Sequence, residues 1–350
     1  MKPSDLYRCT ERLPRVRLAH LPTPLEPLPR LSETLGGPRI FIKRDDCTGL
    51  AFGGNKARHN EFLLGDALEQ GADMLVWGAG VQSNNCRQTA ASCAKLGLAC
   101  HLILSRASHN DEVQGNLLLD HLMGATVEVV DAQLGPEVDA LIAQAAERFR
   151  AQGRRVYSWD RDQVKAKAAA SYLLCMAEVI DQLDALGIEP DAIYLCSSGS
   201  TGAGLALAKA ALGREFPLRF VLPIHWPWDE VEDLCRIANM TAQLLELEVT
   251  VNPDEVDISS EFVGPGYGIP TPEGMEAIKL LAQNEGLLLD PVYTSKAMAA
   301  LIADVRAGRF STDQTIVFIH TGGTPALFAY RDQLSEEFVP KSAGSAVAQG

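Results

Sequence analysis

Positive charge is scarce in this chain of 350 residues, which has 31 lysines and arginines against 45 aspartates and glutamates and a net charge of −14 at pH 7. Nucleic acids and anionic membrane surfaces are bound by clusters of lysine and arginine, so this balance argues against both as partners. An anionic cofactor is not excluded, because a local loop can override the overall sign.

Long apolar runs and metal-binding spacings are also absent. No stretch approaches the roughly 18–20 apolar residues that cross a bilayer, and the first residues are charged and interrupted by proline, unlike a signal peptide. The eight cysteines include no Cys-x-x-Cys pair and the seven histidines no His-x-x-x-His spacing, so we predict no metal site. In a chain of this length we interpret the cysteines as reduced, mostly buried thiols of a cytoplasmic protein.

What the chain does contain is an alternation of strand-like and helix-like segments. The predicted strands are 39–43, 74–77, 100–104, 126–130, 155–157, 192–196, 219–224 and 315–320. The predicted helices are 56–70, 83–96, 110–123, 138–152, 165–186 and 204–212. This order favours right-handed β-α-β units and a mostly parallel sheet, so we predict an α/β fold whose ligands bind at the carboxyl ends of strands.

Three loops combine small residues with groups suited to chemistry. In Gly53-Gly54-Asn55-Lys56 the glycines let a flat ligand approach the backbone, and a lysine amine can bind an aldehyde cofactor. A turn followed by a solvated lysine is the alternative. Segments 78–85 and 197–204 each lie between a strand and a helix start, where free N–H groups bind carboxylate or phosphate. A simple helix cap and a surface linker are the alternatives there.

Three further loops are distinctive in composition. Tyr267 stands among three glycines in 262–271, and a second tyrosine follows in Asp290-Pro291-Val292-Tyr293-Thr294. The last is His320-Thr321-Gly322-Gly323, where we interpret His320 as a satisfied core histidine at the end of a strand. A packed loop anchor is the alternative for Tyr267.

Taken together, the six loops resemble the D-cysteine desulfhydrase and 1-aminocyclopropane-1-carboxylate deaminase family, which includes cysteate sulfo-lyase. These are pyridoxal 5′-phosphate (PLP) enzymes of fold type II, similar to tryptophan synthase β. The resemblance extends over about 20–330 and implies two domains with mostly parallel twisted sheets flanked by helices. Segments 1–58 and 168–335 would form the large PLP-binding domain and 59–167 the small domain, while the Ser/Ala/Gly-rich 336–350 is expected to be a flexible tail.

The resemblance also implies a role for each matched residue. Lys56 would hold PLP and move the substrate α-proton, Ser83 would assist that transfer, and Tyr267 and Tyr293 would act above the cofactor. The cofactor would further contact Asn55, Asn84, Ser198, Gly199, Ser200, Thr201, Gly202, Thr294 and Thr321. Of these, Asn84 would bind the PLP 3-hydroxyl, 198–202 the phosphate, and the two threonines the pyridine nitrogen. The substrate would be held by Ser83, Asn84, Asn85, Tyr267 and Tyr293.

A neutral threonine cannot keep the pyridine nitrogen protonated as a carboxylate would, and this suits elimination of a good leaving group. The resemblance therefore implies a cytoplasmic, homodimeric PLP-dependent lyase that acts by α,β-elimination on a small sulfur-containing amino acid. Cysteate sulfo-lyase activity, deaminase activity on a cyclic substrate, and a PLP-binding protein without catalysis stay open.

Several segments depart from the family pattern. His59 replaces a basic residue near the phosphate, Asn85 replaces histidine or glutamine, 158–162 around Trp159 lacks glycine, and 223–228 is unlike the family. The cofactor positions are kept and the substrate-facing ones are changed, so the leaving group is not predicted.

Overall fold

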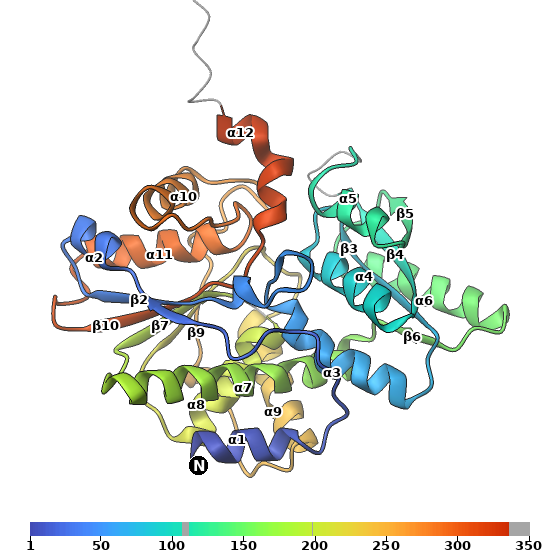
Figure 1. The fold of residues 1–350 in the computed structure, drawn as a ribbon, viewed down its shortest axis with the longest axis horizontal. Helices are drawn as coiled ribbons and strands as arrows, with labels where there is room; N and C mark the ends of the chain where they lie inside the picture. The colour runs from blue at the N-terminus through green and yellow to red at the C-terminus, as the bar shows by residue number, and fades with distance from the viewer. Residues whose placement is uncertain (107–111, 198, 336–350) are drawn as a thin grey trace, which may run out of the picture.

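The computed structural model describes residues 1–106, 112–197 and 199–335 and contains two sheets with helices packed around them (Figure 1). The larger sheet has the order β1 (Leu25–Pro27), β2 (Arg39–Lys43), β10 (Thr315–Ile319), β7 (Ala192–Cys196), β8 (Leu218–Val221) and β9 (Asp257–Ser259). The smaller has the order β5 (Thr126–Val130), β4 (Ala99–Ser105), β3 (Met74–Gly80) and β6 (Val156–Ser158). All neighbours are parallel except β1 and β2, as an α/β fold of β-α-β units requires.

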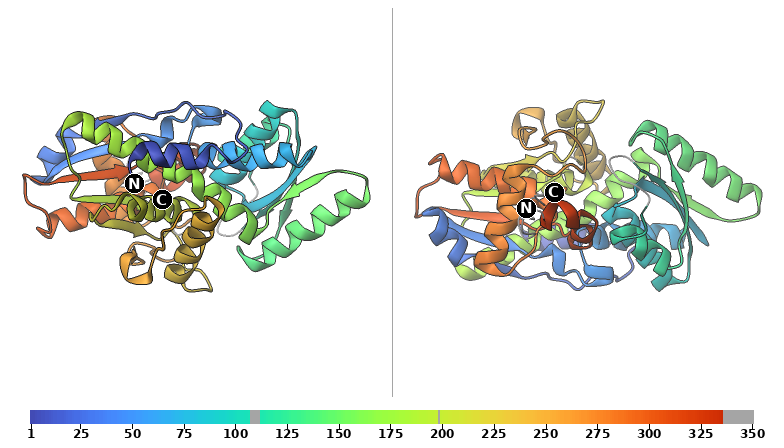
Figure 2. Two further views of the ribbon diagram at one scale, coloured as in Figure 1. Left: turned by 90° about the horizontal axis from the view of Figure 1, so that it is seen from below. Right: turned by 90° about the horizontal axis from the view of Figure 1, so that it is seen from above.

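The larger sheet is covered on both faces (Figures 1 and 2). One face carries α1 (Pro3–Thr10), α7 (Arg161–Leu186), α8 (Ser200–Leu212) and α9 (Glu230–Leu244), and the other α2 (Pro29–Leu35), α10 (Pro272–Glu285) and α11 (Thr294–Arg306). Strand β10 shows why: Val317 and Ile319 belong to the first core, and Ile316 and Phe318 to the second. A strand buried on both faces is therefore apolar throughout.

The smaller sheet follows the same rule on a smaller scale. Its helices are α3 (Lys56–Glu69), α4 (Asn84–Leu96), α5 (Gly115–Leu122) and α6 (Pro136–Ala151). Along β3, Leu75 and Trp77 pack into the core that includes α4, and Met74 and Val76 into the core that includes α6. All eight cysteines are free and all but Cys47 are buried, which confirms the prediction of unpaired, mostly buried thiols.

Two differences from the predicted elements bear on the site. Helix α8 begins at Ser200, four residues before the predicted start, because Gly199 already lies at the N-cap. Helix α7 begins at Arg161 rather than 165, because the Asp160 carboxylate caps it by accepting from the N–H groups of Asp162 and Gln163. The segment around Trp159 is therefore the start of a helix and not an open loop.

Other elements were missed or fall outside the description. The sequence prediction omitted β1 and β9, together with α1, α2, α9, α10, α11 and the short α12 (Arg331–Ser335). The predicted helix start at 110 and the predicted tail at 336–350 lie outside the described residues. No helix in the described ranges is long and apolar enough to span a membrane.

Helices α3 and α7 pack against each other between the two sheets (Figure 1). The predicted domain boundaries at 58/59 and 167/168 fall inside these two helices, while every strand of the smaller sheet lies within 74–158. The residue limits of the domains therefore stay a prediction.

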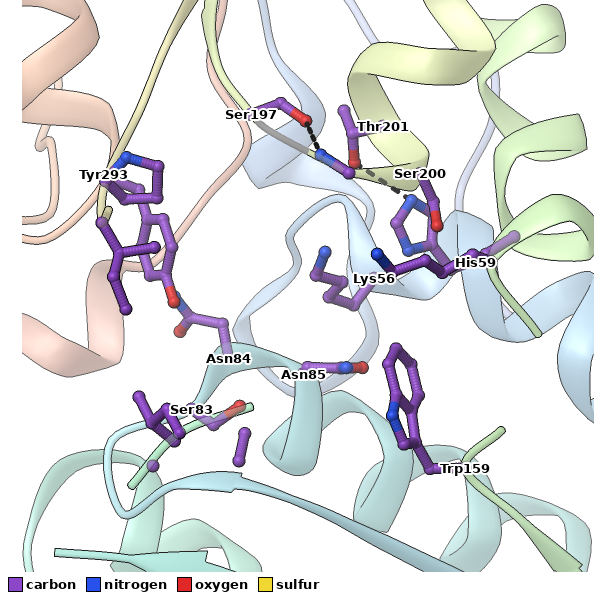
Figure 3. A pocket seen from close by; sticks show the side chains of 18 of the residues that line it. Lys56, His59, Ser83, Asn84, Asn85, Trp159, Ser197, Ser200, Thr201 and Tyr293 are labelled. Carbon is purple, nitrogen blue, oxygen red and sulfur yellow. Dashed lines mark hydrogen bonds between the residues drawn. The ribbon is translucent and has the colours of Figure 1, made fainter. Parts of the chain in front are cut away.

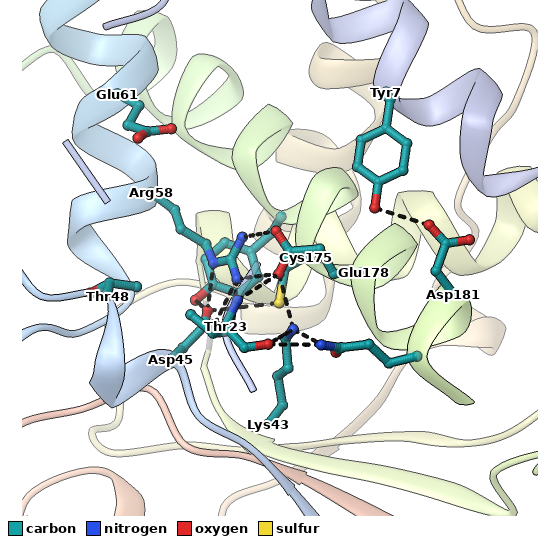
Figure 4. A network of polar contacts seen from close by, with 12 residues as sticks. Tyr7, Thr23, Lys43, Asp45, Thr48, Arg58, Glu61, Cys175, Glu178 and Asp181 are labelled. Carbon is teal, nitrogen blue, oxygen red and sulfur yellow. Dashed lines mark hydrogen bonds and ion pairs between the residues drawn. The ribbon is translucent and has the colours of Figure 1, made fainter. Parts of the chain in front are cut away.

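A buried ionic cluster joins α3 to α7 (Figure 4). The Arg58 guanidinium donates to the Asp45 carboxylate at 2.8 and 2.9 Å and to the Glu178 carboxylate at 2.7 and 2.8 Å. Lys43 Nζ also lies 2.9 Å from Glu178, and Tyr172 donates to Asp45. Burial alone would raise the pKa of Asp45 and Glu178, but Arg58 holds both below their usual values. Both carboxylates are therefore charged at neutral pH.

We expect Arg58→Ala to lower the free energy of unfolding by about 3–5 kcal/mol, because it leaves the Asp45 and Glu178 carboxylates buried with only Lys43 between them. Urea unfolding at pH 7 measures this. The matched control is Arg306→Ala, which breaks the exposed pair with Glu276 and should cost less than about 1 kcal/mol. Equal effects of the two changes would contradict the assignment.

Candidate functional site

A cavity of about 260 Å³ lies between the two sheets (Figure 3). It is bordered by the first residues of α3, α4 and α8, and loops from both sheets close it. The predicted site residues that line it are Asn55, Lys56, Ser83, Asn84, Asn85, Gly199, Ser200, Thr201, Tyr267, Tyr293 and Thr321. The structure therefore brings together residues that are more than 250 positions apart in the sequence.

Lys56 is the first residue of α3 and lies near the middle of the cavity (Figure 3). The turn before it depends on Gly53, which has φ +67° and where a Cβ would lie 1.8 Å from the Asp46 carbonyl oxygen. The Lys56 amine has no hydrogen-bond acceptor among the described residues. Burial lowers its pKa to about 8, which raises the unprotonated fraction at pH 7 roughly 300-fold over an ordinary lysine.

An anion-binding helix start faces the cavity at α8. The N–H groups of Gly199 and Gly202 both donate to Ser197 Oγ, at 3.4 and 2.9 Å. The N–H groups of Ser200 and Thr201 have no acceptor in the described part of the chain, although both residues line the cavity. Free N–H groups at a helix start bind phosphate through hydrogen bonds and the helix dipole.

His59 adds no positive charge to this cradle. The Thr201 hydroxyl accepts from Asn55 Nδ2 at 2.9 Å and lies 3.1 Å from His59 Nε2 (Figure 3). Burial, with Lys56 and Arg58 nearby, holds the pKa of His59 well below its usual value. The neutral ring therefore shares a hydrogen bond with the Thr201 hydroxyl and orients it.

A second helix start with free N–H groups lies across the cavity at α4. Ser83 Oγ caps the helix by accepting from the Cys86 N–H at 3.2 Å, and the N–H groups of Asn84 and Asn85 have no acceptor among the described residues. Asn84 Oδ1 accepts from Asn116 Nδ2 at 3.1 Å, so the Asn84 amide presents its Nδ2 donor elsewhere. This end of the cavity can hold a carboxylate.

Two tyrosines close a third side. The hydroxyls of Tyr267 and Tyr293 are hydrogen-bonded to each other, and their rings meet edge to face at 6.0 Å. Burial raises the pKa of Tyr267 to about 12 and that of Tyr293 well above its usual value. The Tyr267 loop is held by Tyr330, which donates to the Gly268 carbonyl, and by Lys296, which donates to that of Val263. Both phenols are therefore fixed and neutral.

The family model described as "Pyridoxal-phosphate dependent enzyme" matches residues 16–322. The chain belongs to the pyridoxal-phosphate-dependent enzymes. Two D-cysteine desulfhydrases of Klebsiella pneumoniae are 42% and 43% identical to it over 328 residues, which are 92% of this chain and 98% of each relative. The predicted resemblance to the D-cysteine desulfhydrase and deaminase family is therefore confirmed.

Two solved structures support the fold of the enzyme. One, described as an ACC deaminase homologue, is 33% identical with a TM-score of 0.86 and covers 94% of this chain and 98% of its own. The other, diaminopropionate ammonia lyase from Escherichia coli, is 14% identical with a TM-score of 0.66 over 96% of this chain and 92% of its own, and shows the fold alone. The predicted PLP fold type II is thus confirmed.

The residues of the cavity fit PLP. The unpaired Lys56 amine suits the aldehyde, and the free N–H groups of Ser200 and Thr201 suit the phosphate. The Nδ2 donor of Asn84 suits the 3-oxygen, and Thr321 lines the same cavity. These individual roles stay proposals.

Three predicted cofactor residues are not placed in the cavity. Ser198 lies outside the described residues. Gly202 does not line the cavity, and its N–H already donates to Ser197. Thr294 does not line it either, because its buried hydroxyl donates to Asp290 Oδ1 at 2.7 Å and accepts from the Asp290 N–H. Of the two threonines predicted to contact the pyridine nitrogen, Thr321 lines the cavity.

Several residues in or behind the cavity wall were not found from the sequence. Asn116 does not line the cavity but orients Asn84; it belongs to α5 and has no local motif. Ser197 stood first in the predicted phosphate loop, directly after the strand, and that position could have suggested a role in ordering the loop. Cys196 and Lys165 also line the cavity. By contrast, His320 is a satisfied core histidine as predicted: Nδ1 accepts from the Gly322 N–H and Nε2 lies 3.0 Å from the Leu288 carbonyl oxygen.

We expect the rate at which PLP attaches to the cofactor-free protein to rise with pH and to level off above an apparent pKa of about 8. The reason is that only the unprotonated Lys56 amine attacks an aldehyde. Stopped-flow absorbance measures it. Lys56→Ala should show no attached cofactor, whereas Lys95→Ala, on the exposed end of α4, should behave as wild type. An apparent pKa near that of a free lysine would contradict the assignment.

Proposed function

We propose that this enzyme is a lyase that catalyses α,β-elimination on a small sulfur-containing amino acid such as D-cysteine. The products are a keto acid, ammonia and sulfide. The observation that carries the proposal is an unpaired, partly unprotonated Lys56 amine in one cavity with two anion-binding helix starts and two neutral tyrosines. The names of the relatives that share 42% and 43% identity support it.

The chain's own residues divide the work as follows. Bound PLP supplies covalent attachment of the amino acid and an electron-accepting ring. The N–H groups of Asn84 and Asn85 hold the substrate carboxylate at the start of α4. The Lys56 amine accepts the α-proton, and Ser83, which lines the same cavity, assists that transfer.

The sulfur that leaves Cβ also needs a proton donor. Tyr267 and Tyr293 remain protonated at neutral pH because burial raises the pKa of both, so either hydroxyl can donate. The Cβ–S electrons leave with sulfur, and water then converts the aminoacrylate into keto acid and ammonia. Tyr293 is also held by its N–H bond to Asp290, which fixes the donor.

A deaminase acting on a cyclic substrate is a second candidate, favoured by the structural relative described as an ACC deaminase homologue. Such a reaction opens a carbon ring and releases no sulfide. Cysteate sulfo-lyase activity is a third and would release sulfite. A PLP-binding protein without catalysis would release nothing.

We expect the holoenzyme to release sulfide and pyruvate from D-cysteine, because the neutral tyrosines can protonate the leaving group. Keto-acid and sulfide yields from a panel of D- and L-cysteine, cysteate and 1-aminocyclopropane-1-carboxylate measure this. Lys56→Ala should lower turnover at least 1,000-fold, as expected for loss of the proton acceptor and the attachment point.

A control separates the loss of Lys56 from general damage. Tyr7→Phe removes a tyrosine hydroxyl that is bonded to Asp181 and does not line the cavity, and it should leave turnover within about twofold. If no member of the panel yields keto acid or perturbs the cofactor absorbance, the lyase proposal is wrong.

We propose also that the enzyme is a cytoplasmic homodimer. Eight free cysteines suit a reducing compartment. Large exposed apolar side chains, among them Leu118 and Leu122 of α5 and Phe328 of the 3-10 helix at Thr324–Tyr330, lie on elements that contact each other and could be covered by a second copy. Light scattering of the full chain should therefore give twice the chain mass of 37.8 kDa, and a monomer would contradict the dimer.

A further inference from the structure

All four tryptophans of this chain line the one cavity that contains Lys56. They come from distant parts of the sequence: Trp77 from β3, Trp159 from the turn before α7, and Trp226 and Trp228 from the segment between β8 and α9. Only 6% of the residues are aromatic, so this concentration is a property of the site and not of the composition.

Trp226 and Trp228 form one rigid wall. Their rings stack at 4.7 Å with an angle of 11°. The Arg161 guanidinium lies 4.2 Å from the centre of the Trp228 ring, and a Cβ at Gly135 would lie 3.6 Å from Trp226. Gly135 directly precedes α6, and Arg161 is the first residue of α7. The two stacked rings therefore fix the segment after β8 against the other side of the cavity.

Trp77 and Trp159 form a second wall. Their rings meet edge to face at 5.2 Å and 81°. Figure 3 shows the Trp159 indole beside Asn85, at the helix start that we assign to the substrate carboxylate. The indole walls therefore begin where the bound amino acid would lie.

Three of the four indoles have an unsatisfied donor. The Nε1 atoms of Trp77, Trp159 and Trp228 are buried and have no hydrogen-bond partner among the described residues. Buried donors in native proteins nearly always have an acceptor, which can belong to a ligand. These nitrogens have almost no exposed surface, so a ligand with acceptor atoms in the cavity would pair with them after a small rotation of the indoles.

The charges around these walls cancel. Arg161 is paired with Asp139 at 2.9 Å, and Lys165 with Asp233 at 2.7 Å. The four side chains line the cavity, so this part of it carries no net charge. A neutral group is therefore favoured over a sulfonate or a carboxylate, which would have to leave water without a free cation to meet it.

Resting on the proposed lyase function, we propose that the tryptophan-lined part of the cavity binds the β-substituent of the substrate. The substrate class is then an amino acid whose β-substituent is a neutral, flat aryl group with acceptor atoms, such as an S-aryl cysteine. In the reaction the α-proton passes to Lys56, and the Cβ–S bond breaks with both electrons going to the aryl thiolate. Water then converts the aminoacrylate into pyruvate and ammonia.

Binding is tested on the holoenzyme with amino acids that have no leaving group. The D and L forms of 4-nitrophenylalanine, phenylalanine and alanine are titrated, and the change in cofactor absorbance gives the affinity. We expect 4-nitrophenylalanine to bind at least tenfold more tightly than alanine, and more tightly than phenylalanine, since the nitro oxygens accept from the indole donors.

Conservative variants test the donors. Trp159→Phe and Trp228→Phe keep an aromatic ring but remove an unpaired N–H, and at least one should reduce the preference for 4-nitrophenylalanine over phenylalanine about five- to tenfold. Trp226→Phe alters the same wall without removing one of these three donors and should change that preference less than twofold.

Turnover separates this inference from the proposed function. S-(4-nitrophenyl)cysteine and S-phenylcysteine are compared with D-cysteine, β-chloroalanine and cysteate by pyruvate release. Three results would each overturn the inference. They are turnover of the small substrates with no aryl binding, equal affinity for alanine and 4-nitrophenylalanine, and preferred turnover of cysteate. Tight aryl binding without turnover of any substrate would instead overturn the lyase function and leave the ligand class standing.

Discussion

The guanidinium of Arg58 is enclosed by the Asp45 and Glu178 carboxylates, two residues after Lys56, the lysine that we propose binds the cofactor. A buried cation has to keep its partners, because removing one leaves an uncompensated charge in a medium that cannot solvate it. Asp45 follows β2, Arg58 lies on α3, and Glu178 on α7. Their mutual attraction therefore fixes the start of α3 against the larger sheet, and with it the position of Lys56.

Helices α3 and α7 join the two sheets, so their junction determines the shape of the cavity. α3 and α7 run between the sheets, and the cavity lies where α3, α4 and α8 begin. By our proposal, anions bind there to backbone N–H groups rather than to surface cations, which is how a chain of net charge −14 can hold a phosphate. His59 shows how far this goes: it is neutral and serves only to orient Thr201.

Much of the fold could be predicted because the strands of the larger sheet are buried on both faces. Segments 39–43 and 192–196 match β2 and β7, since an apolar run between turn residues is a strong strand signal. The helices at 230–244, 272–285 and 294–306 were missed, although they complete the layers. The start of α7 was also missed, because its cap at Asp160 is recognisable only once the side chain is seen to accept from two N–H groups.

The sequence by itself determined the cofactor, because six loops in order, Gly53-Gly54-Asn55-Lys56 among them, resemble those of a PLP enzyme family. It also determined the set of loops that meet at the site. Tertiary structure alone decided what each side chain can do there. Thr294 is turned away by its bonds to Asp290, Asn84 is oriented by Asn116, and the tryptophans meet at one cavity. The Thr294 bonds are local, but the other two arrangements depend on hydrogen bonds and ring contacts between distant segments, which no local pattern in the sequence encodes.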